Sequence, residues 1–247
     1  MLSRLAGIVE ETEKHYENYM FFKIYRLVYN FCVYEISSLY LDILKDRLYT
    51  FGTNSFERRS CQTVLYEILK ALLKLLAPIL SFTTEEAYRE LCPDSGSIHT
   101  SLLEWDEDKL EAWKTKDLDD KWEKLLKVRE EVLKVLEAKR AAGEIGSSLE
   151  ARVLLYSDKE NFAGFLKENA SLLPAFFIVS EVDISEAKEK DSHKCDTLPL
   201  WISAEKAEGK KCQRCWNYSL TVGQEKGHED ICLRCLRVIQ KMHTKEE

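Results

Sequence analysis

The sequence predicts a mainly α-helical protein, in which an antiparallel helical bundle is followed by a small α/β connecting unit and a C-terminal finger of four cysteines. Three observations support this fold class. Apolar residues recur at helical intervals through the first hundred residues, the pattern changes to alternation near residue 150, and two C-x-x-C pairs stand close to the end. We place the domains at residues 1–108, 109–208 and 209–247.

The N-terminal region begins with an amphipathic helix over residues 2–15, and a second helical pattern runs from Tyr19 to Tyr49. That second run ends at the breaker Phe51-Gly52-Thr53-Asn54. It carries a stripe of large apolar residues, namely Phe22, Tyr25, Tyr29, Phe31, Tyr34 and Leu39. A stripe at helical spacing is usually part of a core, so we expect these side chains to be buried.

The next helical pattern, over residues 64–76, is among the strongest in the chain, and Pro78 closes it. We expect this helix to be deeply buried. Thr83-x-x-Glu86 has the spacing of a capping box and predicts a short helix that ends near Cys92. Four or five such helices pack economically as an antiparallel bundle.

The connecting unit begins with a long amphipathic helix that Asp117 opens and Gly143 ends. Residues 149–156 alternate like a strand, and Ser157-x-x-Glu160 predicts a capped helix through Lys167. Residues 176–179 and 198–202 are further strand candidates. The change of period predicts a small mixed α/β unit.

The two C-x-x-C pairs predict a metal site formed by Cys212, Cys215, Cys232 and Cys235. The intervening residues 216–231 give a separation that is typical of tetrahedral zinc. Four thiolates fill the coordination shell and leave no position for a substrate, so we expect one structural Zn²⁺ and no zinc catalysis. A redox pair is the weaker alternative, because it would require a single C-x-x-C near a βαβ unit.

A basic, aromatic surface surrounds the first cysteine pair. It consists of Lys210, Lys211, Arg214, Trp216, Asn217 and Tyr218. The net charge of −7 argues against indiscriminate nucleic-acid binding, so any contact with RNA is expected to be local. Trp216 and Arg214 are our candidate pair for stacking on a base, and the alternative is that Trp216 packs into the small core of the finger.

The remaining composition favours a reducing compartment, because the other cysteines are scattered without the spacing of a disulfide framework. The N-terminus lacks an apolar signal core, and no run approaches the roughly 18 apolar residues of a membrane span, so we expect no membrane partner. The sequence has no Gly-rich phosphate loop, no G-x-S-x-G and no H-E-x-x-H. We therefore assign no catalytic residues.

Several segments resemble the isoleucyl-tRNA synthetase family of class Ia aminoacyl-tRNA ligases. Residues 40–49, 58–63 and 75–80 resemble the anticodon-binding bundle that the isoleucine, valine and leucine enzymes share. Residues 210–218 and 231–235 resemble the terminal zinc finger of the bacterial-type isoleucine enzyme, and residues 128–153 are similar to its connecting region. The resemblance covers nearly the whole chain.

The resemblance implies a module that binds the anticodon arm of isoleucine tRNA. The catalytic domain of the same synthetase would attach isoleucine to this tRNA in an ATP-dependent reaction. Lys45, Arg47, Arg58 and Arg59 are candidates for phosphate or base contact, with an internal Asp46–Arg47 ion pair as the alternative. The catalytic half of the family carries two signatures, one like H-I-G-H and one like K-M-S-K-S. This chain has neither of them, so we expect it to be inactive alone. The style of the finger favours a bacterial cytoplasm, with the mitochondrial matrix as the alternative.

Two other classes of protein remain as rivals. DNA glycosylases also end in a four-cysteine finger, but they carry a catalytic proline and glutamate after the initiator methionine, where this chain has Leu2 and Ser3. A zinc-stabilised helical module that binds only proteins is the second rival. Binding of tRNA at several salt concentrations separates it from the anticodon-binding hypothesis.

Overall fold

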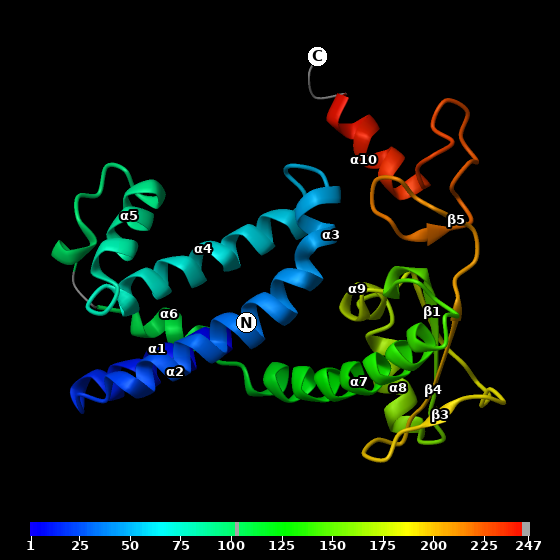
Figure 1. Cartoon of the computed structure of the whole chain (residues 1–247), viewed down its shortest axis with the longest axis horizontal. Helices are drawn as coiled ribbons and strands as arrows, with labels where there is room; N and C mark the ends of the chain where they lie inside the picture. The colour runs from blue at the N-terminus through cyan, green and yellow to red at the C-terminus, as the bar shows by residue number, and fades with distance from the viewer. Residues whose placement is uncertain (102–103, 244–247) are drawn as a thin grey trace. The chain divides into compact units, whose positions relative to one another are not determined.

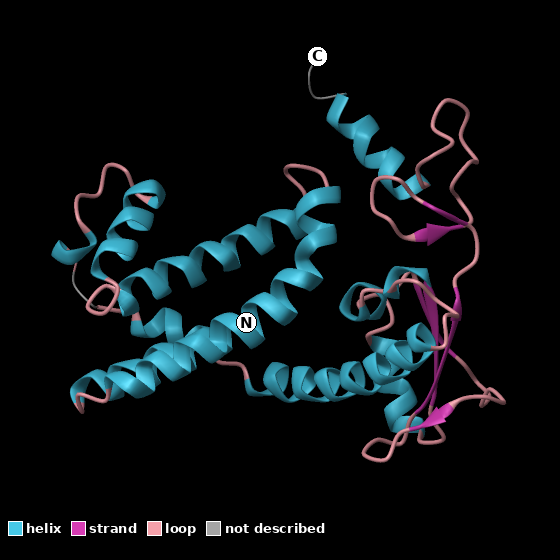
Figure 2. Ribbon diagram, viewed as in Figure 1, coloured by secondary structure: helices cyan, strands magenta, loops and turns pink. Residues whose placement is uncertain are grey.

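Helices dominate the chain, and the strands are confined to its second half (Figure 2). The computed structural model describes residues 1–101 and 104–243. The chain forms two compact units, one of Met1–Leu44 with Asn54–Asp119 and the other of Lys45–Thr53 with Asp120–Glu247. The mainly helical fold with a four-cysteine finger is as the sequence predicts, whereas the three domain boundaries remain a prediction.

The helices of the first half follow one another with short connections (Figure 1). They are α1 Leu2–Glu17, α2 Phe21–Asn30, the π-helical segment η1 Phe31–Leu41, α3 Asp42–Thr50, α4 Phe56–Leu76, α5 Ser81–Leu91, the 3-10 turn η2 Ile98–Thr100 and α6 Glu107–Trp113. The hydroxyl of Ser55 caps α4 by accepting a hydrogen bond from the Arg58 backbone N–H at 3.3 Å.

The core of the first unit lies between α1, η1, α4 and α6. It contains Leu5, Ala6, Ile8, Val9, Phe31, Ile68, Ala71, Leu75 and Leu110. Tyr16 adds a polar contact to this core, because its hydroxyl donates to the Leu75 carbonyl at 2.6 Å. The expectation of a buried α4 holds for its inner face, while Leu69 on its outer face is 41% exposed.

The aromatic stripe is not the core that its spacing predicts. Phe31 is buried, but Phe22, Tyr25, Tyr29 and Tyr34 are 71%, 66%, 48% and 63% exposed. In α2 the buried positions are Ile24 and Val28. The buried stripe is thus turned by about one residue from the aromatic one, and smaller β-branched side chains fill the inner face.

The α2, η1 and α3 segments form one continuous helix, Phe21–Thr50, which is long and apolar enough to cross a membrane by length and composition. The expectation that no run approaches this length is therefore wrong. The helix meets the criterion because aromatic and aliphatic residues are frequent in it and charged residues are few. Helices of soluble proteins also satisfy this criterion, so it does not assign the helix to a bilayer.

Both predicted capping boxes are wrong, because the first helix begins ahead of its box and the serine of the second box binds elsewhere. The α5 helix begins at Ser81, ahead of Thr83 and Glu86, and its N-cap Leu80 provides no side-chain hydrogen bond. The hydroxyl of Ser157 donates to the Pro199 carbonyl at 2.6 Å and accepts from the Lys159 N–H, which leaves the α8 helix without a side-chain cap.

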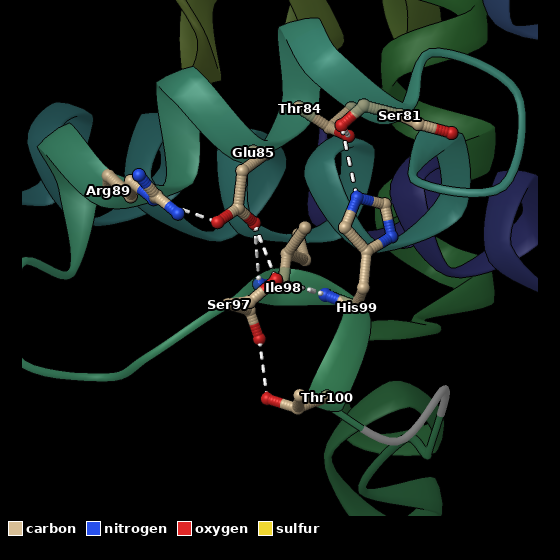
Figure 3. Close-up of polar contacts among 8 residues, drawn as sticks. All are labelled: Ser81, Thr84, Glu85, Arg89, Ser97, Ile98, His99 and Thr100. Carbon is tan, nitrogen blue, oxygen red and sulfur yellow. Dashed lines mark hydrogen bonds and ion pairs between the residues drawn. The ribbon is translucent and has the colours of Figure 1, made fainter.

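The α5 helix is instead fastened through Glu85 (Figure 3). One carboxylate oxygen of Glu85 accepts from the Ser97 hydroxyl at 2.8 Å and from the Ile98 N–H at 3.0 Å. The other accepts from Arg89 Nε at 2.8 Å. These contacts lower the pKa of Glu85, chiefly through the Ser97 hydroxyl, and they join α5 to the η2 turn.

The second half begins with a long helix and continues into a sheet. Its elements are α7 Lys116–Ala141, η3 Ser148–Glu150, β1 Ala151–Tyr156, α8 Glu160–Glu168, α9 Leu173–Phe177, β2 Glu181–Ile184, β3 His193–Lys194, β4 Trp201–Lys206, β5 Lys210–Lys211, β6 Tyr218–Ser219 and α10 Leu233–His243. Gly143 ends α7 as expected, with φ of +74°. The four-stranded sheet has the order β2-β1-β4-β3, and β5 pairs with β6 alone.

The register of the sheet explains the alternation in the sequence. β1 runs parallel to β2, with Arg152 opposite Glu181, and antiparallel to β4, with Val153 opposite Ala204. Along β1 every second side chain is buried. Arg129 of α7 is buried as well, and its Nε donates to the Phe176 carbonyl at 2.9 Å.

Two strand candidates need correction. Residues 176–179 end the α9 helix instead of forming a strand, since Pro174 starts a helical turn and Ile178 adopts the left-handed C-cap with φ of +60°. The strand follows at Glu181. The candidate at 198–202 is displaced, because β4 begins only at Trp201 and extends to Lys206. Short apolar runs do not distinguish buried helix from buried strand.

Candidate metal centre and nucleic-acid interface

The four predicted cysteine ligands come together. The Sγ atoms of Cys212, Cys215, Cys232 and Cys235 all lie within 4.8 Å of one another. The Cys215 and Cys232 sulfurs are 3.8 Å apart. Four sulfurs bound tetrahedrally at 2.3 Å from a zinc ion would be separated by about 3.8 Å, so this donor set fits Zn²⁺ and completes a structural site.

Two turns aim the sulfurs at a common point. After β5, the Cys212 N–H donates to the Asn217 carbonyl at 2.9 Å, and the Trp216 N–H donates to the Cys212 carbonyl at 2.8 Å. At the second pair, the Cys232 N–H points to Cys212 Sγ at 3.3 Å, immediately before α10 begins. The apolar core around the cysteines is small and contains Val222, Ile231 and Leu236. The metal therefore replaces a core that this segment is too short to form.

A shared hydrogen bond makes the Cys215 and Cys235 thiols unequal. A hydrogen bond from Cys235 lowers the pKa of Cys215 to about 4, against the opposing effect of burial, and Arg234 acts in the same direction. The same hydrogen bond raises the pKa of Cys235. Zinc binding requires deprotonated thiols, so protons compete with the metal at Cys232 and Cys235, whose pKa values are raised.

Two arginines surround the sulfur cluster. Arg214 Nη1 lies 3.7 Å from Cys235 Sγ and also donates to the Thr50 carbonyl. Arg234 Nη2 donates to Asp46 Oδ1 at 2.7 Å, and its Nη1 donates to the other carboxylate oxygen. Burial alone lowers the pKa of Arg234, but Asp46 and the Cys215 thiolate more than offset this and raise it. Both arginines lie beside a centre that zinc and four thiolates make negative.

Trp216 does not pack into the core of the finger. Its side chain is 58% exposed and its φ is +66°, in the left-handed region that bulky residues rarely adopt. The ammonium group of Lys211 lies 5.4 Å from the centroid of the indole ring. Lys210 and Lys211 are exposed on β5, opposite Ser219 and Tyr218. The structural alternative for Trp216 is therefore wrong, and an indole face is presented next to basic side chains.

The remaining RNA-contact candidates fall into two places. Lys45 is exposed and Arg47 is half-buried on α3, in the segment that groups with the second unit. Asp46, between them, binds Arg234, so the predicted Asp46–Arg47 pair is replaced by an Asp46–Arg234 pair.

Arg58 and Arg59 lie in the first turn of α4, within the first unit. Arg58 Nε is buried without a hydrogen-bond partner among the described residues, and Arg59 Nη1 donates to Gln62 at 2.9 Å. All four basic residues of this group and the basic residues of the finger remain predicted RNA contacts.

Sequence reasoning missed Arg234 and the contact of Arg214 with Thr50. Arg234 occupies the second x of the C-L-R-C motif, and Arg214 occupies the corresponding place in C-Q-R-C. This repeated arginine was the available signal. The partner segment lies more than 160 residues earlier in the chain, so the contact is visible only in three dimensions.

The fold and the site define a helical protein that carries a closed structural zinc finger with an exposed basic and aromatic surface. Residues 1–155 match the family described as anticodon-binding domain of tRNA ligase, and residues 209–238 match the zinc finger found in FPG and IleRS. The first match covers more than half of the chain. The chain belongs to the family of anticodon-binding domains of tRNA ligases.

Curated relatives are similar over almost the whole chain. The isoleucine–tRNA ligase of Thermotoga petrophila is 40% identical over 239 residues, which is 97% of this chain and 26% of that protein. The isoleucine–tRNA ligases of Desulforamulus reducens and Carboxydothermus hydrogenoformans are 43% and 42% identical over 249 and 244 residues. The chain spans about a quarter of the length of these relatives.

Proposed function

We propose that this chain is the tRNA-binding part of an isoleucine–tRNA ligase and that it holds the anticodon arm of isoleucine tRNA. Family membership supports binding of tRNA. The preference for isoleucine tRNA rests on the relatives, which are isoleucine–tRNA ligases. The anticodon is a single-stranded loop, and sequence-specific recognition of RNA generally targets such unpaired bases.

Trp216 is the observation that carries this proposal. An indole that the finger holds in solvent at a left-handed backbone position provides a platform for an unpaired base. Strained backbone at an exposed residue points to a functional constraint. Lys211, over the same ring, adds a positive charge where the adjoining phosphate would lie.

The basic residues of the bundle are proposed to contact phosphates. Lys45 and Arg47 lie on α3, and Arg58 and Arg59 lie at the start of α4. The overall charge of −7 leaves these local groups to provide the attraction.

Amino-acid activation is proposed to belong to the catalytic part of the same ligase. The relatives are about four times as long as this chain, which has neither of the family's catalytic signatures. The chain alone is expected to give no isoleucine-dependent exchange of pyrophosphate into ATP, and any such exchange above a no-protein control contradicts this assignment. A bacterial cytoplasm is the proposed location, with the mitochondrial matrix as the alternative.

The proposal is tested by titrating the zinc-loaded chain with the isoleucine anticodon stem-loop and with a stem-loop of unrelated anticodon. We expect tighter binding of the isoleucine stem-loop and a negative slope of log K against log salt concentration. Equal affinity for both RNAs would contradict the proposed preference for isoleucine tRNA. No binding of either would favour the protein-interaction module.

Trp216→Ala tests the stacking residue. Loss of one stacked base costs roughly 1–3 kcal/mol, so affinity should fall by about one to two decades while zinc content and helicity stay unchanged. Leu220→Ala is the matched control, because Leu220 is a 65% exposed apolar residue of the same finger. Equal weakening by both variants would assign the effect to the fold of the finger.

A further inference from the structure

The two arginines between the cysteines contact the same distant segment. Arg214 donates to the carbonyl of Thr50, and Arg234 binds both carboxylate oxygens of Asp46. The Arg234 guanidinium also lies 5.4 Å from the centroid of the Phe51 ring. All three partners belong to Lys45–Thr53, which groups with the finger in one compact unit.

The contact made by Arg214 gives a hydrogen-bond donor to the carbonyl at the C-terminal end of α3. This helix ends at Thr50, and the last carbonyls of a helix have no partners within the helix. Thr50 is only 7% exposed, so water has limited access to satisfy it. A guanidinium group at this end donates to an orphan carbonyl and also opposes the negative pole of the helix dipole.

The contact made by Arg234 differs in geometry from an ordinary surface ion pair. Water screens exposed pairs, and two flexible side chains must be ordered to form them. Here the Arg234 and Asp46 side chains are 41% and 27% exposed, but the pair is bidentate and the guanidinium lies over an aromatic ring. Asp46 is also held in place, since the Thr50 hydroxyl donates to its Oδ1 at 2.7 Å.

The same guanidinium groups also lie beside the metal centre. Arg214 Nη1, which donates to the Thr50 carbonyl, lies 3.7 Å from Cys235 Sγ, and Arg234 hydrogen-bonds to the Cys215 sulfur. Four thiolates with one Zn²⁺ carry a charge of −2, and the two guanidinium groups bring positive charge next to it. The planar fork of arginine has five N–H donors in a fixed geometry, so one guanidinium group can donate to a sulfur and an oxygen at once.

We propose that Arg214 and Arg234 are positioning residues that fasten Lys45–Thr53 to the zinc centre, so that zinc occupancy sets where Lys45 and Arg47 lie relative to Trp216. The zinc finger then has a role beyond its own folding, because it orders the end of α3. The consequence for RNA rests on the proposed function, whereas the fastening itself can be measured without RNA.

Hydrogen exchange of the full chain tests the fastening. With zinc bound, the amides at the C-terminal end of α3 are expected to be protected. Arg234→Gln should keep one zinc per chain and lower this protection about ten-fold or more, since charge-assisted hydrogen bonds of roughly 1.5–3 kcal/mol are lost. Chelation of zinc should have the same effect on wild-type chain, while α1 keeps its protection.

Two further variants keep the test decisive. Asp46→Asn lies away from the cysteines, so it must lower protection even if Arg234→Gln loses metal. Arg237→Gln is the matched control, because Arg237 is an exposed arginine of the same helix, and it should leave protection unchanged. Unchanged protection in Asp46→Asn, or equal loss in Arg237→Gln, would overturn the proposal.

Binding of the isoleucine anticodon stem-loop to Asp46→Asn separates the two proposals. If the fastening positions RNA contacts, affinity falls together with protection while zinc content is constant. Suppose that wild-type chain binds the stem-loop and that Asp46→Asn binds it equally well despite lower amide protection. The proposed positioning of Lys45 and Arg47 is then refuted. If wild-type chain binds no RNA, the proposed function fails and the exchange result alone decides the fastening.

Discussion

Leu75 in α4 and Ile231 in the finger are both buried, but they are buried by different means. Leu75 belongs to a cluster of nine buried residues from α1, η1, α4 and α6. Around Ile231 the buried cluster has six residues, and three of them are the metal-binding cysteines Cys212, Cys232 and Cys235. Burial of apolar surface stabilises the helical core, whereas the finger depends on metal coordination.

This difference predicts how each region fails. A core of interlocking helices loses stability in increments, because each removed methylene leaves a cavity that neighbours partly fill. A closed tetrahedral site has no spare ligand, so loss of one thiolate removes a large part of its stabilisation at once. Perturbations confined to one region should therefore leave the other folded.

Removal of zinc is expected to have the largest effect. Structural zinc contributes about 10–16 kcal/mol in isolated fingers, so chelation or Cys212→Ser should unfold residues 209–238. Hydrogen exchange should show loss of protection there, with α1 and α4 unchanged. A finger that stays protected after its zinc is gone would show that its apolar cluster suffices.

Truncation in the helical core should be the second largest effect. Leu75→Ala removes a side chain with 0% exposure and should cost about 2–5 kcal/mol, measured by urea unfolding monitored at α-helical wavelengths. Zinc content should remain one per chain. Leu69→Ala, at a 41% exposed position of the same helix, should cost less than about 1 kcal/mol. Similar costs at both sites would contradict the assigned inner face of α4.

A glycine in the finger gives a third test. A Cβ at Gly209, where φ is +88°, would lie 2.3 Å from the backbone carbon of Ser219. Gly209→Ala should therefore separate β5 from β6 and weaken retention of zinc against a competing chelator. Gly227→Ala is the control, since its φ is +84° but nothing lies within 4 Å of its Cβ, leaving only about 1–2 kcal/mol of backbone strain. Equal effects would exclude the backbone clash as the cause.

Glu85 should give the smallest effect and a pH dependence. Its folded pKa is lowered from the ordinary 4.5, so its stabilising contribution is present above pH 4.5 and is lost as pH falls through the folded pKa. Glu85→Gln should lower Tm slightly at pH 7, and the difference from wild type should shrink below pH 4.5. A difference that does not change with pH would mean that the carboxylate charge contributes nothing to the contact between α5 and η2.

The sequence predicted the parts of the molecule that depend on local spacing. Periodicity identified α1, α4 and α7, and the C-x-x-C spacing identified all four metal ligands. The errors occurred where a pattern is satisfied by more than one structure. Residues 176–179 read as a strand although Pro174 starts a helix there, and the aromatic stripe of α2 lies outside while Ile24 and Val28 lie inside.

Capping motifs failed for a related reason. A serine or threonine hydroxyl binds whichever acceptor the tertiary fold brings near, so Ser157 binds Pro199 instead of capping α8. The real fastening of α5 uses Glu85 and Ser97, twelve residues apart. No local rule predicts that distance.

The sequence by itself determined the metal, because thiolate chemistry and a fixed ligand spacing leave few other choices. It also determined the helical class, since apolar periodicity must be buried on one face. Only the tertiary structure decided what Arg214 and Arg234 do. Their charges are evident in the sequence, but the carbonyl of Thr50 and the carboxylate of Asp46 reach them through folding, which gives an arginine its partner and its role.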